Sequence, residues 1–280
     1  MTDAWLLQAR RRFHAACLAG PITVTSGVPS IADVSNPASR EIASALILKI
    51  GASTDRAVKP AGQTAGNMFE SACRVFIAET LAKLQHLRPG VFSVERAKHI
   101  SMFDQYADLD ELRALAEKSR ELKTLLGTDY LIKPDVIVTR AAEPDSQINL
   151  HDHLVDDKVA KRTALRQANG VRPTLHASIS CKLTIRSDRV QNTRSEALNL
   201  IRNRKGRLPH IAAVTAEPLP SRIAAIALGT GDIDCVYHFA LAELVDVLRE
   251  QGRETLELVE TMIEGQRLRD IADLPLDLII

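Results

Sequence analysis

One stretch of alternating residues, LHASISCKLTIR at positions 175–186, constrains the fold more strongly than any other part of the chain. From Leu175 onward the odd-numbered residues are apolar and the even-numbered residues are polar, which is the pattern of a β-strand with two different faces. Lys182 belongs to the polar face. We therefore expect a sheet that buries one face of this strand and turns the other toward solvent or into a cleft.

Further strands and helices are indicated around this strand. β-branched and apolar residues favour strands at 134–140, 210–218 and 233–239. Apolar spacing near 3.6 residues favours helices at 3–19, 37–50, 67–86, 108–126, 154–168, 193–203 and 239–265. Asn36 and Pro37 are a favourable N-cap and first residue for the second of these helices. The sequence predicts one α/β domain over residues 1–280, with a helical N-terminal part.

The composition is that of an ordinary globular protein. The 280 residues are 45% hydrophobic and 25% charged, which suffices for a large core. The four cysteines stand apart, without metal-ligand spacing. No apolar run is long enough to span a membrane, and none precedes a cleavage site at the N-terminus. We expect a cytoplasmic protein with reduced thiols and no membrane partner.

Positive charge gathers directly after the alternating strand. Residues 182–207 contain eight Lys or Arg and two acidic residues, whereas the whole chain has a net charge of only +1. Such a local concentration is typical of an anion site, and a polyanion such as DNA is the obvious candidate. A solvated charged face is the structural alternative.

Asp135 is a candidate metal-binding carboxylate that could act together with Lys182. It follows Pro134 at the start of an apolar strand, where an acid is costly unless a cation pairs with it. Phosphodiester hydrolysis uses metal-bound carboxylates near the scissile phosphate, and a lysine beside them can orient the attacking water. Many nucleases have a second acid two residues before this lysine, but here that position is Ser180.

Glu196, at the start of the next expected helix, is the candidate to replace the missing acid. A structural role is equally open, because Thr193-Arg-Ser-Glu196 has the spacing of a capping box. The spacing by itself does not decide between the two roles.

Taken in order along the chain, these residues resemble a known family. Pro134-Asp135, Lys182 and Glu196, separated by 46 and then 13 residues, are similar to the permuted active-site pattern of restriction endonucleases that cut at CCGG. The resemblance is strongest to NgoMIV-type enzymes, through LHASISCK, TIRSDR, NLIRNRKGRLPHI, SRIAAIALGTGDIDCVYHFAL, IADLPLDL and, at 62–70, GQTAGNMFE. It covers most of the chain from about Gly62 and weakens in the first 60 residues.

This resemblance implies a fold and an active site. The fold would be α/β and restriction-endonuclease-like, the PD-(D/E)xK core with a mixed central sheet flanked by helices. Mg²⁺ would be held by Asp135, the backbone carbonyl of Cys181 and Glu196. Lys182 and Glu70 would complete the catalytic group. From the residues alone Glu70 is only a solvated helix residue beside an apolar face, so the resemblance carries its role.

The resemblance also implies which residues read the DNA. An arginine can donate two hydrogen bonds to guanine and an aspartate can accept one from cytosine, so Arg186, Asp188 and Arg189 match the two G·C pairs of a CCGG half-site. Contacts to the outer pair of a six-base site, GCCGGC, are implied for Arg222, Ser35 and Gln63. A homodimer or homotetramer would cut this palindrome and leave four-base 5′ extensions.

Two other functions stay open from the sequence. One is a sequence-specific DNA-binding protein that does not cut, against which the intact Asp135, Lys182 and Glu196 argue. The other is a structure-specific nuclease of repair or recombination on the same fold. The cluster of Arg186, Asp188 and Arg189 argues against that second reading, because it is suited to reading bases.

Overall fold

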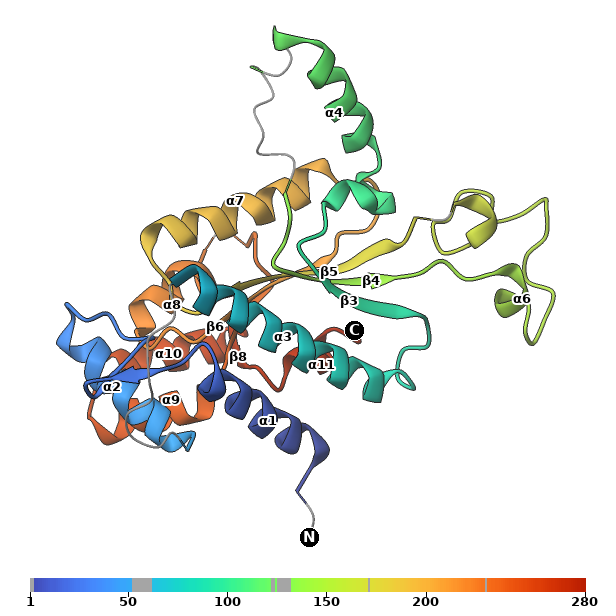
Figure 1. The fold of residues 1–280 in the computed structure, drawn as a ribbon. Helices are drawn as coiled ribbons and strands as arrows, with labels where there is room; N and C mark the ends of the chain where they lie inside the picture. The colour runs from blue at the N-terminus through green and yellow to red at the C-terminus, as the bar shows by residue number, and fades with distance from the viewer. Residues whose placement is uncertain (1–2, 52–61, 122–123, 125–131, 171, 230) are drawn as a thin grey trace.

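A mixed six-stranded sheet forms the centre of the molecule (Figure 1). The computed structural model describes residues 3–51, 62–121, 124, 132–170, 172–229 and 231–280. In spatial order, the strands are β3 (Phe92–Arg96), β4 (Val136–Arg140), β5 (Thr174–Lys182), β6 (His210–Thr215), β7 (Cys235–His238) and β8 (Leu268–Asp270). β3, β4 and β5 are antiparallel, whereas β5 to β8 are parallel. The expected α/β fold with a mixed central sheet is confirmed.

Helices cover both faces of this sheet. α7 (Ser187–Asn203) meets one face of β5, since the hydroxyl of Thr193 lies 3.2 Å from that of Ser180. α3 (Gly62–Leu84) lies on the opposite face, where Cys73 meets the side chain of Cys181. Around these lie α1 (Trp5–Ala19), the short strands β1 (Val24–Thr25) and β2 (Val28–Pro29), α2 (Pro37–Lys49), α8 (Pro220–Ala227), α9 (Leu241–Glu250), α10 (Thr255–Glu264) and α11 (Leu274–Asp277).

Of the two outcomes left open for the polar face of the central strand, solvent or a cleft, exposure to solvent is wrong. His176, Ser178 and Ser180 are only 7%, 5% and 7% exposed, because helices cover both faces of β5. A β-bulge also interrupts the alternation: Ala177 pairs with Val138 and Leu175 pairs with the next residue of β4, which leaves His176 extra. Burial of His176 and Ser180 is tolerated because His176 bonds to the carbonyl of Leu278 and Ser180 bonds to the hydroxyl of Thr193.

Several helix boundaries differ from those that the sequence indicated. The helix expected at 193–203 begins at Ser187, six residues earlier, and the single helix expected at 239–265 is divided into α9 and α10. The strand expected to reach 186 ends at Lys182. The cap of α2 is confirmed, since the side chain of Asn36 accepts from the backbone N–H of Ser39. α4 (Asp108–Lys118) confirms the start of the helix expected at 108–126, and part of the remainder lies outside the described residues.

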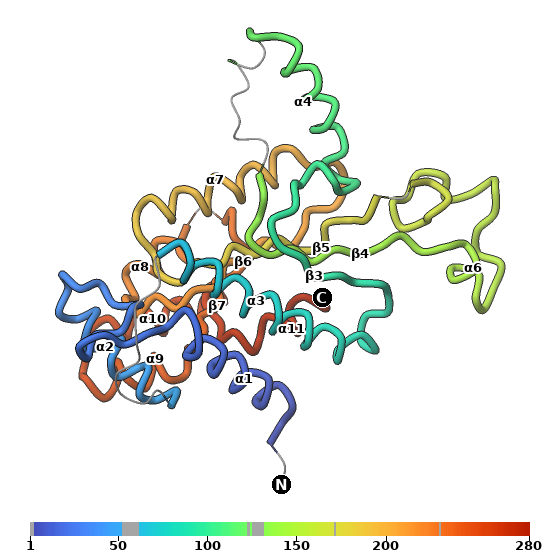
Figure 2. Tube along the Cα trace, in the orientation of Figure 1, coloured from blue at the N-terminus to red at the C-terminus, as the bar shows by residue number. Residues whose placement is uncertain are grey.

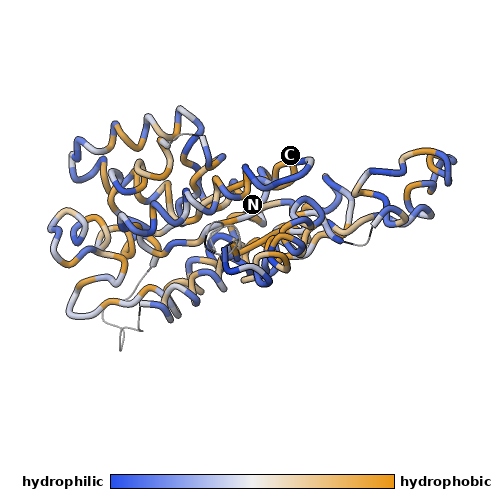
Figure 3. The backbone as a smooth tube through the Cα atoms, turned by 90° about the horizontal axis from the view of Figure 1, so that it is seen from above, coloured by the Kyte–Doolittle hydropathy of each residue, from blue (hydrophilic) through white to orange (hydrophobic). Residues whose placement is uncertain are grey.

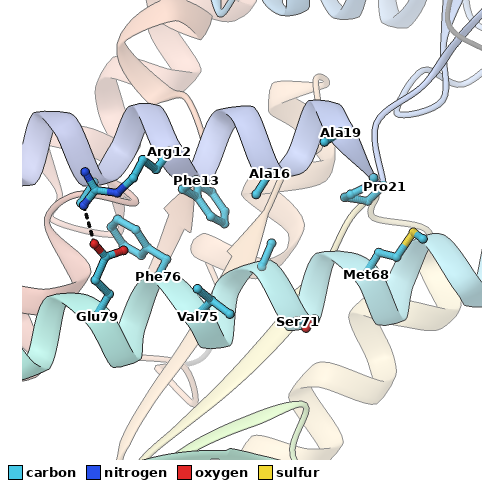
Figure 4. Close-up of a pocket in the computed structure, with 13 residues that line it drawn as sticks. Arg12, Phe13, Ala16, Ala19, Pro21, Met68, Ser71, Val75, Phe76 and Glu79 are labelled. Atoms are coloured by element: carbon cyan, nitrogen blue, oxygen red, sulfur yellow. Dashed lines mark hydrogen bonds and ion pairs between the residues drawn. The ribbon is translucent and has the colours of Figure 1, made fainter.

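Helix α1 of the N-terminal part packs on α3 (Figure 4), whereas α2 packs on α9. Phe13 of α1 stacks on Phe76 of α3 with ring centroids 5.2 Å apart. A groove of about 450 Å³ remains between the two helices, bordered by small and apolar side chains and by an ion pair of Arg12 with Glu79. The buried side chains of the N-terminal part belong to the same core cluster as the strands. That shared core supports the prediction of a single domain over 1–280, which remains a prediction.

Residues 141–170, here called the arm, extend away from the sheet between β4 and β5 (Figure 2). The helix expected at 154–168 is wrong: the arm has only α6 (Asp145–Ile148) and the short 3-10 turn Gln167–Asn169. Asp156 instead accepts from the backbone N–H groups of Lys158 and Val159, a local bond that competes with helix formation. Seen from above, the arm stands clear of the body and shows hydrophobic residues at intervals (Figure 3). Among them, Leu150 and Leu154 are 60% and 62% exposed.

The arm is held together by Arg166, so removing the side chain of Arg166 should destabilise the arm without destabilising the sheet. Arg166 is only 5% exposed, and it binds both oxygens of Asp145 at 2.6 Å and the carbonyl of Val159 at 2.8 Å. In Arg166→Ala, limited proteolysis should cut within the arm at least about tenfold faster, with little change in the melting temperature of the sheet. The exposed Arg162 supplies the control variant Arg162→Ala, and equal cleavage rates in both variants would contradict this role of Arg166.

None of the helices in the described part of the chain combines the length and the apolar character that crossing a lipid bilayer requires. The four cysteines are buried and free.

Candidate active site and DNA interface

Asp135 and Lys182 meet where β4 begins and β5 ends. Because the two strands are antiparallel, the residue before β4 lies beside the last residues of β5. Lys182 Nζ and the backbone N–H of Cys181 each donate to Asp135 Oδ2 at 2.7 Å, and the hydroxyl of Ser180 lies 3.5 Å from the same oxygen. The side chains of Asp135 and Lys182 are 17% and 19% exposed. The carboxylate is therefore fixed and nearly, but not fully, enclosed.

α7 brings Glu196 to this pair. Thr193, one turn earlier on the helix, is anchored on Ser180, which sets Glu196 against the same end of β5. Burial and the negative charge of Asp135 raise the pKa of Glu196 from 4.5 to about 7, although Lys182 acts in the opposite direction. Burial opposes the charge of Lys182, but the two carboxylates outweigh it, and the pKa of Lys182 is raised. Asp135, Lys182 and Glu196 thus form one electrostatic cluster.

The capping-box alternative for Glu196 is wrong. The N-cap of α7 is Arg186, so Thr193 and Glu196 lie in the interior of the helix. The unpaired N–H groups that a capping box satisfies are in the first turn, before both residues. Thr193 points instead to β5, and Glu196 points to the cluster of Asp135 and Lys182.

The donor atoms of this cluster suit a hard divalent cation. Asp135 and Glu196 supply carboxylates, and the carbonyl of Cys181 is the third candidate ligand; Mg²⁺ prefers oxygen ligands of this kind, completed by water and substrate phosphates. Burial and the negative charge of Asp135 raise the pKa of Glu196, and a cation between the two acids would oppose both effects. In the part of the chain that the structure describes, no group of three or more His, Cys, Asp or Glu side chains is arranged to hold a metal.

Glu70 lies on α3 and pairs with Arg96 at the end of β3. Arg96 is aligned with Val136 in the sheet, next to Asp135, so the pair lies along the same strand ends. The Nε atom of Arg96 is buried and has no hydrogen-bond partner among the described residues. The predicted catalytic residue Glu70 is thus held by an arginine that the sequence analysis missed.

The three residues expected to read the inner base pairs lie directly beyond Lys182. Arg186 caps α7, and Asp188 and Arg189 lie in its first turn. Arg186 and Asp188 are exposed, whereas Arg189 is partly covered because its NH1 donates to the carbonyl and to the hydroxyl of Thr184, both at 2.8 Å. The segment is therefore held in a set conformation four to seven residues from the end of β5.

A hollow of about 680 Å³ lies beside this segment and gathers Arg186, Arg222 and Ser35. Asp33 joins two of them: it pairs with Arg222, and it accepts from the backbone N–H and hydroxyl of Ser35 at 3.1 and 2.7 Å. The bonds from Ser35 and Arg222 lower the pKa of Asp33 to about 2. Gln63, the remaining predicted contact, is exposed in the first turn of α3 and does not line this hollow.

A second residue that the sequence analysis missed is Glu217, which is 0% exposed. Its two oxygens accept from the backbone N–H groups of Ile185 at 2.8 Å and Leu219 at 3.1 Å. Burial raises its pKa, and these two bonds and the charge of Arg222 oppose the shift. In the sequence Glu217 is an acid just after an apolar strand, the counterpart of Asp135, which stands just before one.

Known proteins share this sequence over nearly its full length. The model of the family described as NgoMIV restriction enzyme matches residues 13–280. The type II restriction enzyme NgoMIV of Neisseria gonorrhoeae is 52% identical over 281 residues, which cover 98% of each chain. The resemblance seen in the motifs is confirmed, and it extends through the first 60 residues, where the motifs alone were thin.

The charge cluster predicts that Glu196→Gln changes how stability depends on pH. Because the folded-state pKa of about 7 lies above 4.5, the contribution of Glu196 to stability is fully present below pH 4.5 and is lost as pH rises through 7. Glutamine keeps the neutral form at every pH. At pH 8, without metal, the variant should gain about 1–3 kcal/mol of unfolding free energy over the parent, with no gain at pH 4.5.

Chemical denaturation at the two pH values, in the presence of a chelator, measures this difference. Mg²⁺ added at pH 8 should stabilise the parent more than the variant. Parallel pH profiles of the two proteins would show that Glu196 is not the titrating member of the cluster.

Proposed function

Because the chain belongs to the NgoMIV restriction enzyme family, it is a type II restriction enzyme, and we propose that it cuts double-stranded DNA at GCCGGC. The proposal includes Mg²⁺ as cofactor and four-base 5′ extensions as product ends. The observation that carries it is the joining of two groups of residues on one segment. Asp135, Lys182 and Glu196 meet at the end of β5, and the chain then continues directly into Arg186, Asp188 and Arg189.

In the proposed reaction, Asp135, Glu196 and the carbonyl of Cys181 would hold the metal. Bound there, Mg²⁺ would act as a Lewis acid on the scissile phosphate and on the attacking water. Lys182 keeps its proton, since its pKa is raised, and its fixed position beside Asp135 suits it to orient that water and to offset charge on the phosphate. Glu70 takes part as a further carboxylate that Arg96 holds at the strand ends.

In the proposed recognition, Arg186 and Arg189 donate to guanines and Asp188 accepts from cytosine in each CCGG half-site. Arg222 and Ser35, from the hollow beside α7, read the outer pair together with Gln63. The proposal is supported by the exposure of Arg186 and Asp188, which leaves their polar atoms open to a ligand.

A palindromic site requires two copies of the chain related by a two-fold axis, so we propose a homodimer or a homotetramer. The exposed leucines of the arm offer apolar surface for a contact between subunits. The four free cysteines are compatible with the reducing cytoplasm as the place of action.

Plasmid cleavage tests the reaction. With Mg²⁺, a plasmid that has one GCCGGC site should give a single linear product with four-base 5′ ends, and a plasmid without the site should stay uncut. Lys182→Ala should lower the cleavage rate by at least about 10²-fold, because the group beside the phosphate is lost, while specific binding remains. Random fragments would favour the structure-specific nuclease, and a gel shift without cleavage would favour the non-cutting binder.

Base reading predicts a second, separable effect. Arg189→Ala should weaken binding to a GCCGGC duplex by ~1–3 kcal/mol, the value of a two-bond guanine contact, and should hardly change binding to a scrambled duplex. Lys205, whose side chain is 72% exposed after α7, serves as the control because it is suited to phosphate contact. Lys205→Ala should weaken both duplexes equally. Equal losses for Arg189→Ala in a competition titration at fixed salt would contradict its role in sequence reading.

A further inference from the structure

Glu217 is an acidic side chain with no access to solvent, just after the end of β6, and the reaction proposed above does not use it. A buried carboxylate is costly unless hydrogen bonds replace its water. Here the replacement is complete on both oxygens: Oε2 accepts from Ile185 and Oε1 accepts from Leu219, and NH1 of Arg222 lies 3.8 Å from Oε1.

The main chain of Glu217 is fixed as firmly as its side chain. Its N–H donates to the hydroxyl of Thr215 at 3.1 Å. Its carbonyl lies 3.2 Å from Nε2 of the fully buried His238. Because Nδ1 of His238 accepts from the N–H of Ala240, the ring hydrogen is on Nε2 and is donated to Glu217. The main chain of Glu217 is thus bonded both to β6, through Thr215, and to β7, through His238.

The two backbone groups that Glu217 binds belong to the two DNA-reading segments. Ile185 directly precedes Arg186 and follows Lys182 by three residues. Leu219 is the N-cap of α8, the helix that carries Arg222. One carboxylate therefore sets the distance between the segment proposed for the inner base pairs and the helix proposed for the outer pair. The ion pair of Arg222 with Asp33 extends the connection to Ser35.

We propose that Glu217 is a positioning residue that couples the reading of the outer base pair to the reading of the inner pairs and to cleavage. It acts through Ile185 and Arg222, and it does not touch DNA. The proposal rests on the proposed function, because it takes the recognition roles of Arg186 and Arg222 from there.

Glu217→Gln is the direct test, since glutamine has nearly the same shape but only one acceptor oxygen. Its NH₂ group would face one of the two backbone N–H donors, so one reading segment must move. The measurement is kcat/KM on duplexes with GCCGGC and with an altered outer pair such as ACCGGT. The ratio of the two values should fall by about tenfold in the variant, within the range of one mismatched pair.

Asp234→Asn is the matched control. Asp234 accepts from the backbone N–H of Ile211 at 2.7 Å, at the opposite end of β6, so the same chemistry is removed away from the reading segments. This variant should keep the parent's ratio. A double variant adds a second readout: if Glu217 acts through Arg222, then Glu217→Gln should lower the ratio far less when Arg222→Gln is already present.

Thermal melting must show that each variant is folded at the assay temperature. If Glu217→Gln is not, Thr215→Val replaces it, because that change frees the main chain of Glu217 without altering the carboxylate. It should shift the ratio in the same direction. A folded variant that keeps the parent's ratio overturns the proposal. This holds whether the variant cuts all sites more slowly or cuts them as fast as the parent does. A parent protein that cuts no DNA would instead overturn the proposed function, so the two failures are distinct.

Discussion

The contact of Lys182 with Asp135 at 2.7 Å fixes where everything else in the site must lie. It exists because β4 and β5 are antiparallel neighbours, so that the residue entering one strand meets the residues leaving the other. Two partly enclosed charges are stable there only as a pair that is further bonded, here by the backbone N–H of Cys181. Glu196 is buried beside this pair, and burial together with the negative charge of Asp135 raises its pKa.

Three arginines near this site each have an acceptor that fixes the direction of the side chain. Arg189 is bound to Thr184, Arg222 to Asp33, and Arg96 to Glu70. A long cationic side chain that is already ordered loses less conformational entropy when it binds a ligand. The acids and hydroxyls around the hollow therefore matter as much as the cations themselves. This arrangement is hidden in the net charge of +1, which only reports that acids and bases are nearly equal in number.

The sequence predicted those parts of the site that depend on local pattern. An acid at the entrance to an apolar strand identified Asp135, and alternation placed Lys182 on the polar side of β5. Contacts between distant segments escaped it. Neither the pair of Arg96 with Glu70 nor the bonds of Glu217 to two loops has a signature in the spacing of residues. The buried polar face of β5 was missed for a similar reason, because only the packed position of α7 shows that Ser180 is covered.

Helix α7 is a stiff connection between the residues proposed for base reading and those proposed for metal binding. Asp188 and Glu196 are on the same continuous helix, roughly 12 Å apart along its axis at 1.5 Å per residue. A rigid rod of that length that tilts by about 10° moves its far end by roughly 2 Å, comparable to a metal–oxygen bond length. On the proposed function, a wrong base under the first turn of α7 displaces a metal ligand two turns away. Through this lever, a sequence error at the groove disturbs the geometry of the proposed metal site.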